Sequence, residues 1–146
     1  GRGYMTPRPA SSLRFVDRFC ESHAADVDPR RVCLLGFSDG ATVGVELATS
    51  RRFAAVVCAA YGFTGDLPAA ALDRLRDVPF WMIHSEDDEV FAPRCSERFV
   101  AALRAASSRP GDVKLSKPRG LDHVGTALAA SSAPATYEWL LGLASG

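Results

Sequence analysis

The chain has 146 residues, 47% of them hydrophobic, and this length favours a single domain with one core. Lysine plus arginine equal aspartate plus glutamate at 17 each, so the formal net charge is zero. The charges are dispersed along the chain, which argues against nucleic acid as a partner. No stretch approaches the roughly 20 apolar residues that span a bilayer, and the first residues lack the apolar core of a signal peptide. We therefore expect a cytoplasmic protein without a membrane span.

The first part of the chain predicts a helix, a strand and a second helix. Residues 9–25 place apolar side chains on one face of a helix, with charged residues between them. Asp28-Pro29 breaks this helix. Residues 31–37 then form an apolar run that is too short for a helix, so we expect a strand buried on both faces. Apolar and small side chains at helical spacing over residues 39–50 predict the second helix.

The rest of the chain continues to alternate between strands and helices. In order, we expect a strand at 53–61, a short helix at 68–76, a strand at 78–84, a helix at 93–106, a strand at 112–117 and a final helix at 134–143. The last strand is the most polar and is expected nearer an edge of the sheet. This alternation favours an α/β fold in which about four parallel strands are flanked by helices. Residues 1–8 are expected to be a disordered or irregular lead-in to a single domain over residues 9–146.

A Gly-x-Ser-x-Gly motif, Gly36-Phe-Ser-Asp-Gly40, lies between the predicted strand 31–37 and the helix that follows it. In a nucleophile elbow of this kind the serine lies on a strained turn, and small residues on either side let the backbone pass closely. The motif and its strand–turn–helix context predict that Ser38 is a nucleophile. The backbone amide of Asp39, at the start of the helix, is expected to stabilise an oxyanion.

An acidic loop follows the predicted strand 78–84, at the end of the sheet where open α/β folds bind ligands. This loop contains four carboxylates in succession: Glu86, Asp87, Asp88 and Glu89. At most one of them is expected to orient a catalytic base. The other three are expected to belong to a solvated loop.

The predicted base is His123. It lies in a glycine-flanked loop, residues 118–125, which follows the last predicted strand and opens at the same end of the sheet. The nucleophile, the acidic loop and the base therefore occur in the chain order that is found in α/β hydrolases. The other two histidines are interpreted as structural, because His23 precedes the nucleophile strand and His84 ends a strand beside the acidic loop.

Together these segments resemble the carboxyl-terminal half of an esterase or depolymerase of the α/β-hydrolase superfamily, particularly the poly(3-hydroxybutyrate) depolymerase, feruloyl esterase and carboxylesterase group. The resemblance covers about residues 13–143 and rests on residues 27–32 before the elbow and on residues 78–84 before the acid. Such families carry the pattern His-Gly-x-x-Asp-x-x-Val-x-Pro. Here the pattern begins at His84, with Ser85 in place of the glycine, and on this ground alone it prefers Asp88 as the acid.

The same resemblance implies that part of the fold lies outside this chain. The family's sheet has about eight strands, and a second oxyanion amide comes from a loop after an early strand. Neither the amino-terminal strands nor that second donor is found in the sequence. Loss of one such donor lowers the rate about a hundredfold to a thousandfold, so the isolated chain is expected to be a weak catalyst. Strand 31–37 is also expected to present an open edge, through which the chain could self-associate.

The leading prediction is hydrolysis of small-molecule or polymeric carboxylic esters by a Ser-His-Asp triad through an acyl-enzyme. This chemistry needs neither a metal ion nor an organic cofactor, and the four widely spaced cysteines indicate neither a zinc site nor a disulfide framework. Phe37, Tyr61 and Phe63 are candidates for the wall of an acyl pocket. Packing at the strand ends is the simpler explanation of the same side chains.

Two other interpretations remain open. A related hydrolase, such as a lysophospholipase-like thioesterase or a peptidase of the prolyl oligopeptidase type, would share the triad. A catalytically weak or inactive remnant would instead act as an interaction domain and bind a partner through the open edge of strand 31–37.

Overall fold

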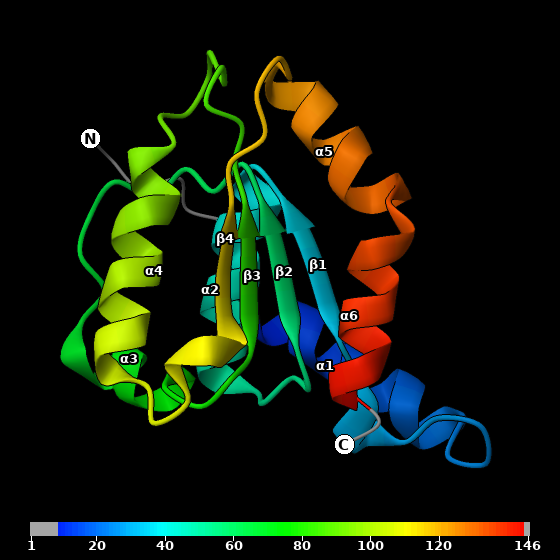
Figure 1. Cartoon of the computed structure of the whole chain (residues 1–146). Helices are drawn as coiled ribbons and strands as arrows, with labels where there is room; N and C mark the ends of the chain where they lie inside the picture. Colours follow the sequence, from blue (N-terminus) through cyan, green and yellow to red (C-terminus); the bar gives the residue numbers. More distant parts are fainter. Residues whose placement is uncertain (1–8, 145–146) are drawn as a thin grey trace.

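The computed structural model of the chain describes residues 9–144, so the predicted lead-in over residues 1–8 lies outside the described part. At the centre lie four parallel strands, arranged side by side in chain order (Figure 1). The strands are β1 (Leu34–Phe37), β2 (Val56–Ala59), β3 (Phe80–Ile83) and β4 (Val113–Ser116). Each strand is shorter than the run that predicted it. The prediction of four parallel strands flanked by helices is confirmed.

Helices cover both faces of the sheet (Figure 1). On one face lie α1 (Pro9–Ser22), α2 (Asp39–Ser50), α3 (Ala69–Leu75) and α4 (Arg94–Ala106), of which α2 and α4 pack directly on the strands. On the other face lie α5 (His123–Ser132) and α6 (Pro134–Ala144). Single-turn 3-10 helices, Pro29–Arg31 and Pro110–Asp112, precede β1 and β4. Among residues 9–144 no helix combines the length and apolar character that crossing a membrane requires.

The two central strands are buried on both faces. Toward α2, α3 and α4, β2 and β3 bury Val56, Cys58, Phe80 and Met82 completely. Toward α5 and α6, the alternate residues of β2 pack in a second cluster that includes Val57. Every residue of β2 is buried, and in β3 only Trp81 is partly exposed, so both strands appear in the sequence as continuous apolar runs rather than as alternating patterns.

The first strand differs from the prediction of a strand buried on both faces. Only Gly36 is buried among its four residues, and Leu35 is 39% exposed. The reason is position: within the described part of the chain, β1 has a neighbour, β2, on one side only. Its outer flank therefore lacks the covering that buries the central strands.

One helix, α5, was not predicted. The expected loop over residues 118–125 ends at Asp122, and His123 is the first residue of the helix. The Asp122 side chain caps this helix by accepting a hydrogen bond from the Gly125 amide at 2.6 Å. Glycine, serine and threonine weaken the helical pattern of this segment, so tertiary packing decides its conformation.

The outer edge of β1 carries backbone groups that β2 does not bind. The amides of Leu34 and Ser38 donate toward β2, to the carbonyls of Ala55 and Ala59 at 3.0 and 2.9 Å. Along a strand, alternate residues turn their amide and carbonyl groups to opposite sides, so those of Leu35 and Phe37 face the outer edge. No other strand of residues 9–144 lies on that side.

An apolar groove of about 590 Å³ lies between α1 and α6, beside residues 31–33 that lead into β1, and its lining includes the exposed side chains of Phe15, Phe19 and Leu141. We expect the purified chain to self-associate here, because an uncharged edge strand beside exposed apolar side chains favours pairing. Sedimentation velocity at several concentrations should show the assembly. Leu35→Lys should shift it toward monomer, whereas Leu128→Lys, at a more exposed site on α5, should not. A wild-type chain that stays monomeric throughout would contradict the prediction.

Candidate active site

Ser38 forms a sharp turn between β1 and α2. Its φ of 54° and ψ of −123° lie outside the regions that residues with a Cβ prefer, and such strain persists only where surrounding contacts hold it. Three backbone bonds hold it here: the Ser38 amide donates to the Ala59 carbonyl at 2.9 Å, and the Ser38 carbonyl accepts from the amides of Ala41 and Thr42 at 2.9 and 3.2 Å. The Ser38 side chain therefore lies at the carboxyl end of β1 and at the amino terminus of α2.

The two glycines of the motif have different surroundings. A Cβ atom on Gly36 would lie 2.5 Å from the Gly40 carbonyl oxygen and 2.9 Å from the Ala41 Cα, and both are backbone atoms. A Cβ atom on Gly40 would meet no atom within 4 Å. The expectation that both glycines relieve crowding is therefore correct for Gly36 and wrong for Gly40, because α2 begins directly over Gly36 while Gly40 faces outward.

We expect Gly36→Ala to destabilise the fold by about 1–3 kcal/mol, since the added methyl group meets backbone atoms that cannot turn away. Gly40→Ala is the matched control and should change stability little, because its methyl group enters open space. Urea unfolding followed by circular dichroism measures both. Equal stability of the two variants would contradict the argument.

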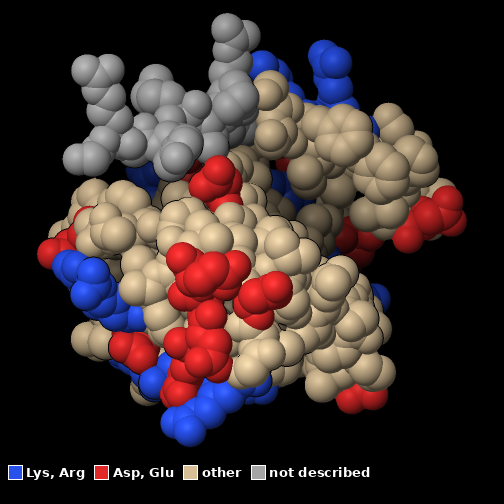
Figure 2. Space-filling model, turned by 90° about the horizontal axis from the view of Figure 1, so that it is seen from above, with Lys and Arg blue, Asp and Glu red and all other residues tan. Residues whose placement is uncertain are grey.

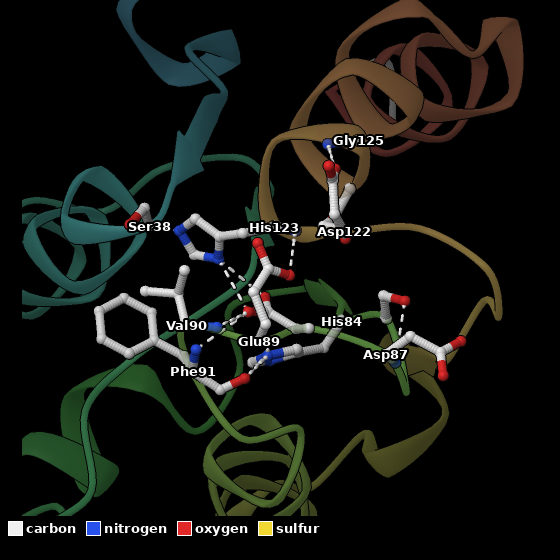
Figure 3. Close-up of polar contacts among 12 residues, drawn as sticks. Ser38, His84, Asp87, Glu89, Val90, Phe91, Asp122, His123 and Gly125 are labelled. Atoms are coloured by element: carbon white, nitrogen blue, oxygen red, sulfur yellow. Dashed lines mark hydrogen bonds and ion pairs between the residues drawn. The ribbon is translucent and has the colours of Figure 1, made fainter.

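The His123 side chain lies between two groups that come from other parts of the chain (Figure 3). Its Nε2 is 2.9 Å from the Ser38 Oγ, and its Nδ1 is 3.0 and 2.8 Å from the two carboxylate oxygens of Asp88. Because an ionised carboxylate can only accept, Nδ1 carries the proton and donates to Asp88. This leaves Nε2 to accept a hydrogen bond from the Ser38 hydroxyl. The three side chains thus form one continuous chain of hydrogen bonds.

Asp88 lies in the loop after β3, and its side chain is 0% exposed. Its Oδ1 also accepts from the amides of Val90 and Phe91, at 2.8 and 2.9 Å. Burial alone would raise the pKa of Asp88, but the Phe91 amide, the His123 imidazole and the Val90 amide together outweigh burial and hold the pKa below its usual value. Asp88 is therefore ionised at neutral pH and can stabilise a positive charge on His123.

The His84 side chain binds the same loop through the Phe91 carbonyl. The ring is fully buried, with Nε2 2.9 Å from the Phe91 carbonyl and Nδ1 2.7 Å from the Ser96 hydroxyl. Its Nε2 also lies 3.4 Å from Asp88. Burial lowers the pKa of His84, against the opposing effects of the Phe91 carbonyl and of Asp88, so the ring is neutral. His84 holds Phe91, whose amide in turn donates to Asp88, and this agrees with its interpretation as a structural residue.

The other three carboxylates of the acidic loop do not simply face water. All three contact the segment that joins β4 to α5: Glu86 pairs with Arg119, Asp87 accepts from the Gly120 amide and Glu89 accepts from the His123 amide. All three residues are exposed, in agreement with the expected solvated loop. Their contacts with the other segment arise because the ends of β3 and β4 are neighbours and bring the two loops together. Seen from above, acidic side chains gather on this end of the molecule (Figure 2).

The backbone amide of Asp39 meets the requirement for an oxyanion donor. As the first residue of α2, Asp39 has no acceptor four residues earlier within the helix. The amino end of a helix also favours negative charge. Its assignment as a donor stays a prediction.

The three candidate pocket residues lie in different surroundings. The Phe37 ring is partly buried and centred 4.9 Å from the His123 ring. Tyr61 is 2% exposed and packs edge-on against Phe99, which places it in the core. The ring of Phe63 is 37% exposed and lies beside the Tyr61 ring, with ring centres 6.5 Å apart. Of the three, Phe37 is the one whose ring packs on the proposed base.

Sequence reasoning missed Phe91 as a site residue. Its amide donates to Asp88, and its ring meets the His123 ring edge-on, with centres 5.4 Å apart. A Cβ atom on Gly62 would lie 2.5 Å from the same ring, so a glycine is needed where the ring packs. The signal in the sequence is the spacing, since Phe91 follows the acid by three residues.

The site consists of side chains for nucleophilic and acid–base chemistry. Within residues 9–144 no three histidine, cysteine, aspartate or glutamate side chains gather in a way that could hold a metal ion. All four cysteines in this range are free thiols, and burial raises the pKa of Cys58 to about 12. The Cys58 thiol therefore stays protonated at neutral pH.

Neither a model of a protein family nor a curated protein matches the sequence. Solved structures do match the fold. A thermostable esterase superposes with a TM-score of 0.76 at 22% identity, over 90% of this chain and 35% of the esterase. For acyl-protein thioesterase 2 from Zea mays the TM-score is 0.64 at 17% identity, over 93% of this chain and 64% of the thioesterase. For a putative α/β hydrolase from Agrobacterium tumefaciens the TM-score is 0.67 at 14% identity, over 97% of this chain and 64% of the hydrolase.

The chain has the fold of part of an α/β hydrolase. It spans between 35% and 64% of the lengths of these three structures. The expected partial α/β-hydrolase fold is therefore confirmed. The narrower resemblance to depolymerases and feruloyl esterases, like the expected cytoplasmic location, stays a prediction.

Proposed function

We propose that the chain is the catalytic part of a serine hydrolase that acts on carboxylic esters. The observation that carries the proposal is the continuous set of hydrogen bonds from Ser38 through His123 to Asp88. A strained serine at the amino terminus of a helix, an imidazole that accepts from it and a buried carboxylate behind the imidazole are the parts that acyl transfer requires.

Each side chain has a defined part in the proposed reaction. The Ser38 oxygen attacks the ester carbonyl carbon while its proton passes to Nε2 of His123, and the Asp39 amide stabilises the oxyanion that forms. His123 then returns the proton to the departing alcohol, which leaves an acyl group on Ser38. In the second half of the reaction a water molecule attacks the acyl group in the same way, with His123 as the base, and the carboxylic acid is released from Ser38. Asp88 stays ionised and stabilises the imidazolium in both halves.

Small esters are the proposed substrates, and a thioester is the second candidate. An acyl-protein thioesterase is among the solved structures with the same fold, and both reactions use the same nucleophile and base. A comparison of p-nitrophenyl butyrate with an S-butyryl analogue distinguishes the two. Parallel assays with p-nitrophenyl acetate and p-nitrophenyl butyrate show which length of acyl chain the protein prefers.

A fluorophosphonate probe tests the proposal directly, because it reacts only with an activated serine. The purified wild-type chain should gain the mass of one phosphonyl group, located by peptide mapping at Ser38. The Ser38→Ala variant should neither be labelled nor hydrolyse p-nitrophenyl butyrate. A folded wild-type chain that resists labelling would refute the enzymatic proposal and favour an interaction domain.

A further inference from the structure

The start of α5 is held by two carboxylates from different parts of the chain. Asp122, the residue just before the helix, accepts from the Gly125 amide at 2.6 Å. Glu89, which lies in the acidic loop after β3, accepts from the backbone amide of His123 itself at 3.1 Å (Figure 3). The first amides of a helix have no partner within it, and its positive end attracts a carboxylate. The acidic loop therefore supplies a capping group to the helix on which His123 lies.

A second contact joins the acidic loop to the segment between β4 and α5, at the turn formed by Gly120. Gly120 has a φ of 75°, in the left-handed region that glycine adopts without strain, and its amide donates to Asp87 at 2.6 Å. The segment between β4 and α5 is thus bonded to the acidic loop at its turn and at its end. Both bonds reach the backbone, so they fix the path of the chain rather than one flexible side chain.

From these contacts we infer that Glu89 is a positioning residue for His123, with Asp87 as a second support. The inference rests on the proposed function, in which His123 is the base. The His123 ring must keep Nε2 at 2.9 Å from Ser38 and Nδ1 at 2.8 Å from Asp88. The backbone amide that Glu89 binds is one bond from the Cα that carries this ring. A small rotation of the helix start would lengthen both contacts, and misplacement of this kind is costly to proton transfer.

Three variants of one loop separate this role from a general effect of charge. Glu89→Ala removes the acceptor and should lower kcat on p-nitrophenyl butyrate between about tenfold and about a hundredfold, with KM unchanged. Glu89→Gln keeps a carbonyl oxygen that can accept from the amide and should restore most of the loss. Glu86→Ala removes the same charge from the same loop, but the Glu86 carboxylate pairs with the side chains of Arg119 and Lys117 rather than with the backbone. Its kcat should match that of the wild type.

A purely structural role would lower the melting temperature of Glu89→Ala without changing kcat in the folded protein, and that result would overturn the inference. So would a loss in Glu86→Ala as large as that in Glu89→Ala, or no recovery in Glu89→Gln. Asp87→Ala, which removes the bond to Gly120, should also lower kcat, by less than Glu89→Ala.

Nuclear magnetic resonance gives a readout that does not need turnover. The proton between Nδ1 of His123 and Asp88 should be visible far downfield in the wild type and in Glu86→Ala, and should be broadened by exchange in Glu89→Ala. An unchanged resonance in Glu89→Ala would refute the positioning role. A wild-type chain that shows this proton but resists the fluorophosphonate would refute the proposed function alone, so the two failures are distinguishable.

Discussion

Replacing His123 with alanine is expected to abolish hydrolysis, with a loss of kcat on the order of a millionfold, or down to the background rate. The reason is the position of the imidazole, because it contacts both Ser38 and Asp88. Without it, the Ser38 hydroxyl keeps its proton and attacks poorly. The measurement is the rate of fluorophosphonate labelling, together with initial rates on p-nitrophenyl butyrate.

His23→Ala is the matched control for this variant. His23 lies after α1 and is exposed, with Nδ1 2.9 Å from the Phe19 carbonyl and its ring stacked on the Phe19 ring. Its removal should leave labelling and turnover at the wild-type level. Appreciable activity in a folded His123→Ala chain would show that another group acts as the base.

The second large effect is expected for Asp88→Asn, which should lower kcat about ten-thousandfold. An asparagine has nearly the same size, but its amide group can donate to Nδ1 of His123. The imidazole would then carry its proton on Nε2 and could no longer accept from the Ser38 hydroxyl. Since Asp88 accepts from two backbone amides as well, the loop should keep its path in the variant.

Asp87→Asn is the comparison that decides the assignment of the acid. The Asp87 side chain accepts a backbone hydrogen bond from Gly120, and the asparagine oxygen can do the same. This variant should retain most of its activity. Equal losses in the two variants, or a larger loss in Asp87→Asn, would overturn the choice of Asp88.

Much of the fold could be predicted from local signals. The runs that become β2 and β3 are continuously apolar because all of β2, and all of β3 except the partly exposed Trp81, is buried in the structure. Helix α2 begins at Asp39, as its spacing predicts. The expectation of part of an α/β-hydrolase fold also follows from the chain order of the elbow, the acidic loop and the histidine. In contrast, α5 was missed because its apolar side chains do not form a strong helical stripe, and Leu128 is 64% exposed.

The candidate site was predicted less completely. The position of Ser38 between two glycines, and the chain order of Ser38, the acidic loop and His123, follow from short motifs. Nothing in the sequence reveals that Glu89 contacts the His123 amide, because the two residues are 34 positions apart and meet only when β3 and β4 pair. The same is true of the contact between the Phe91 and His123 rings.

The sequence by itself determined the chemistry that the chain can offer: a serine in a glycine-flanked elbow, an acidic loop and a histidine, each after a predicted strand. Local spacing suffices for this, since an elbow is built from consecutive residues. The resemblance to the family already preferred Asp88 as the acid. Only the tertiary structure decided which carboxylates hold the backbone around His123. The register of parallel strands sets those distances, and register depends on the packing of the whole sheet rather than on any one segment.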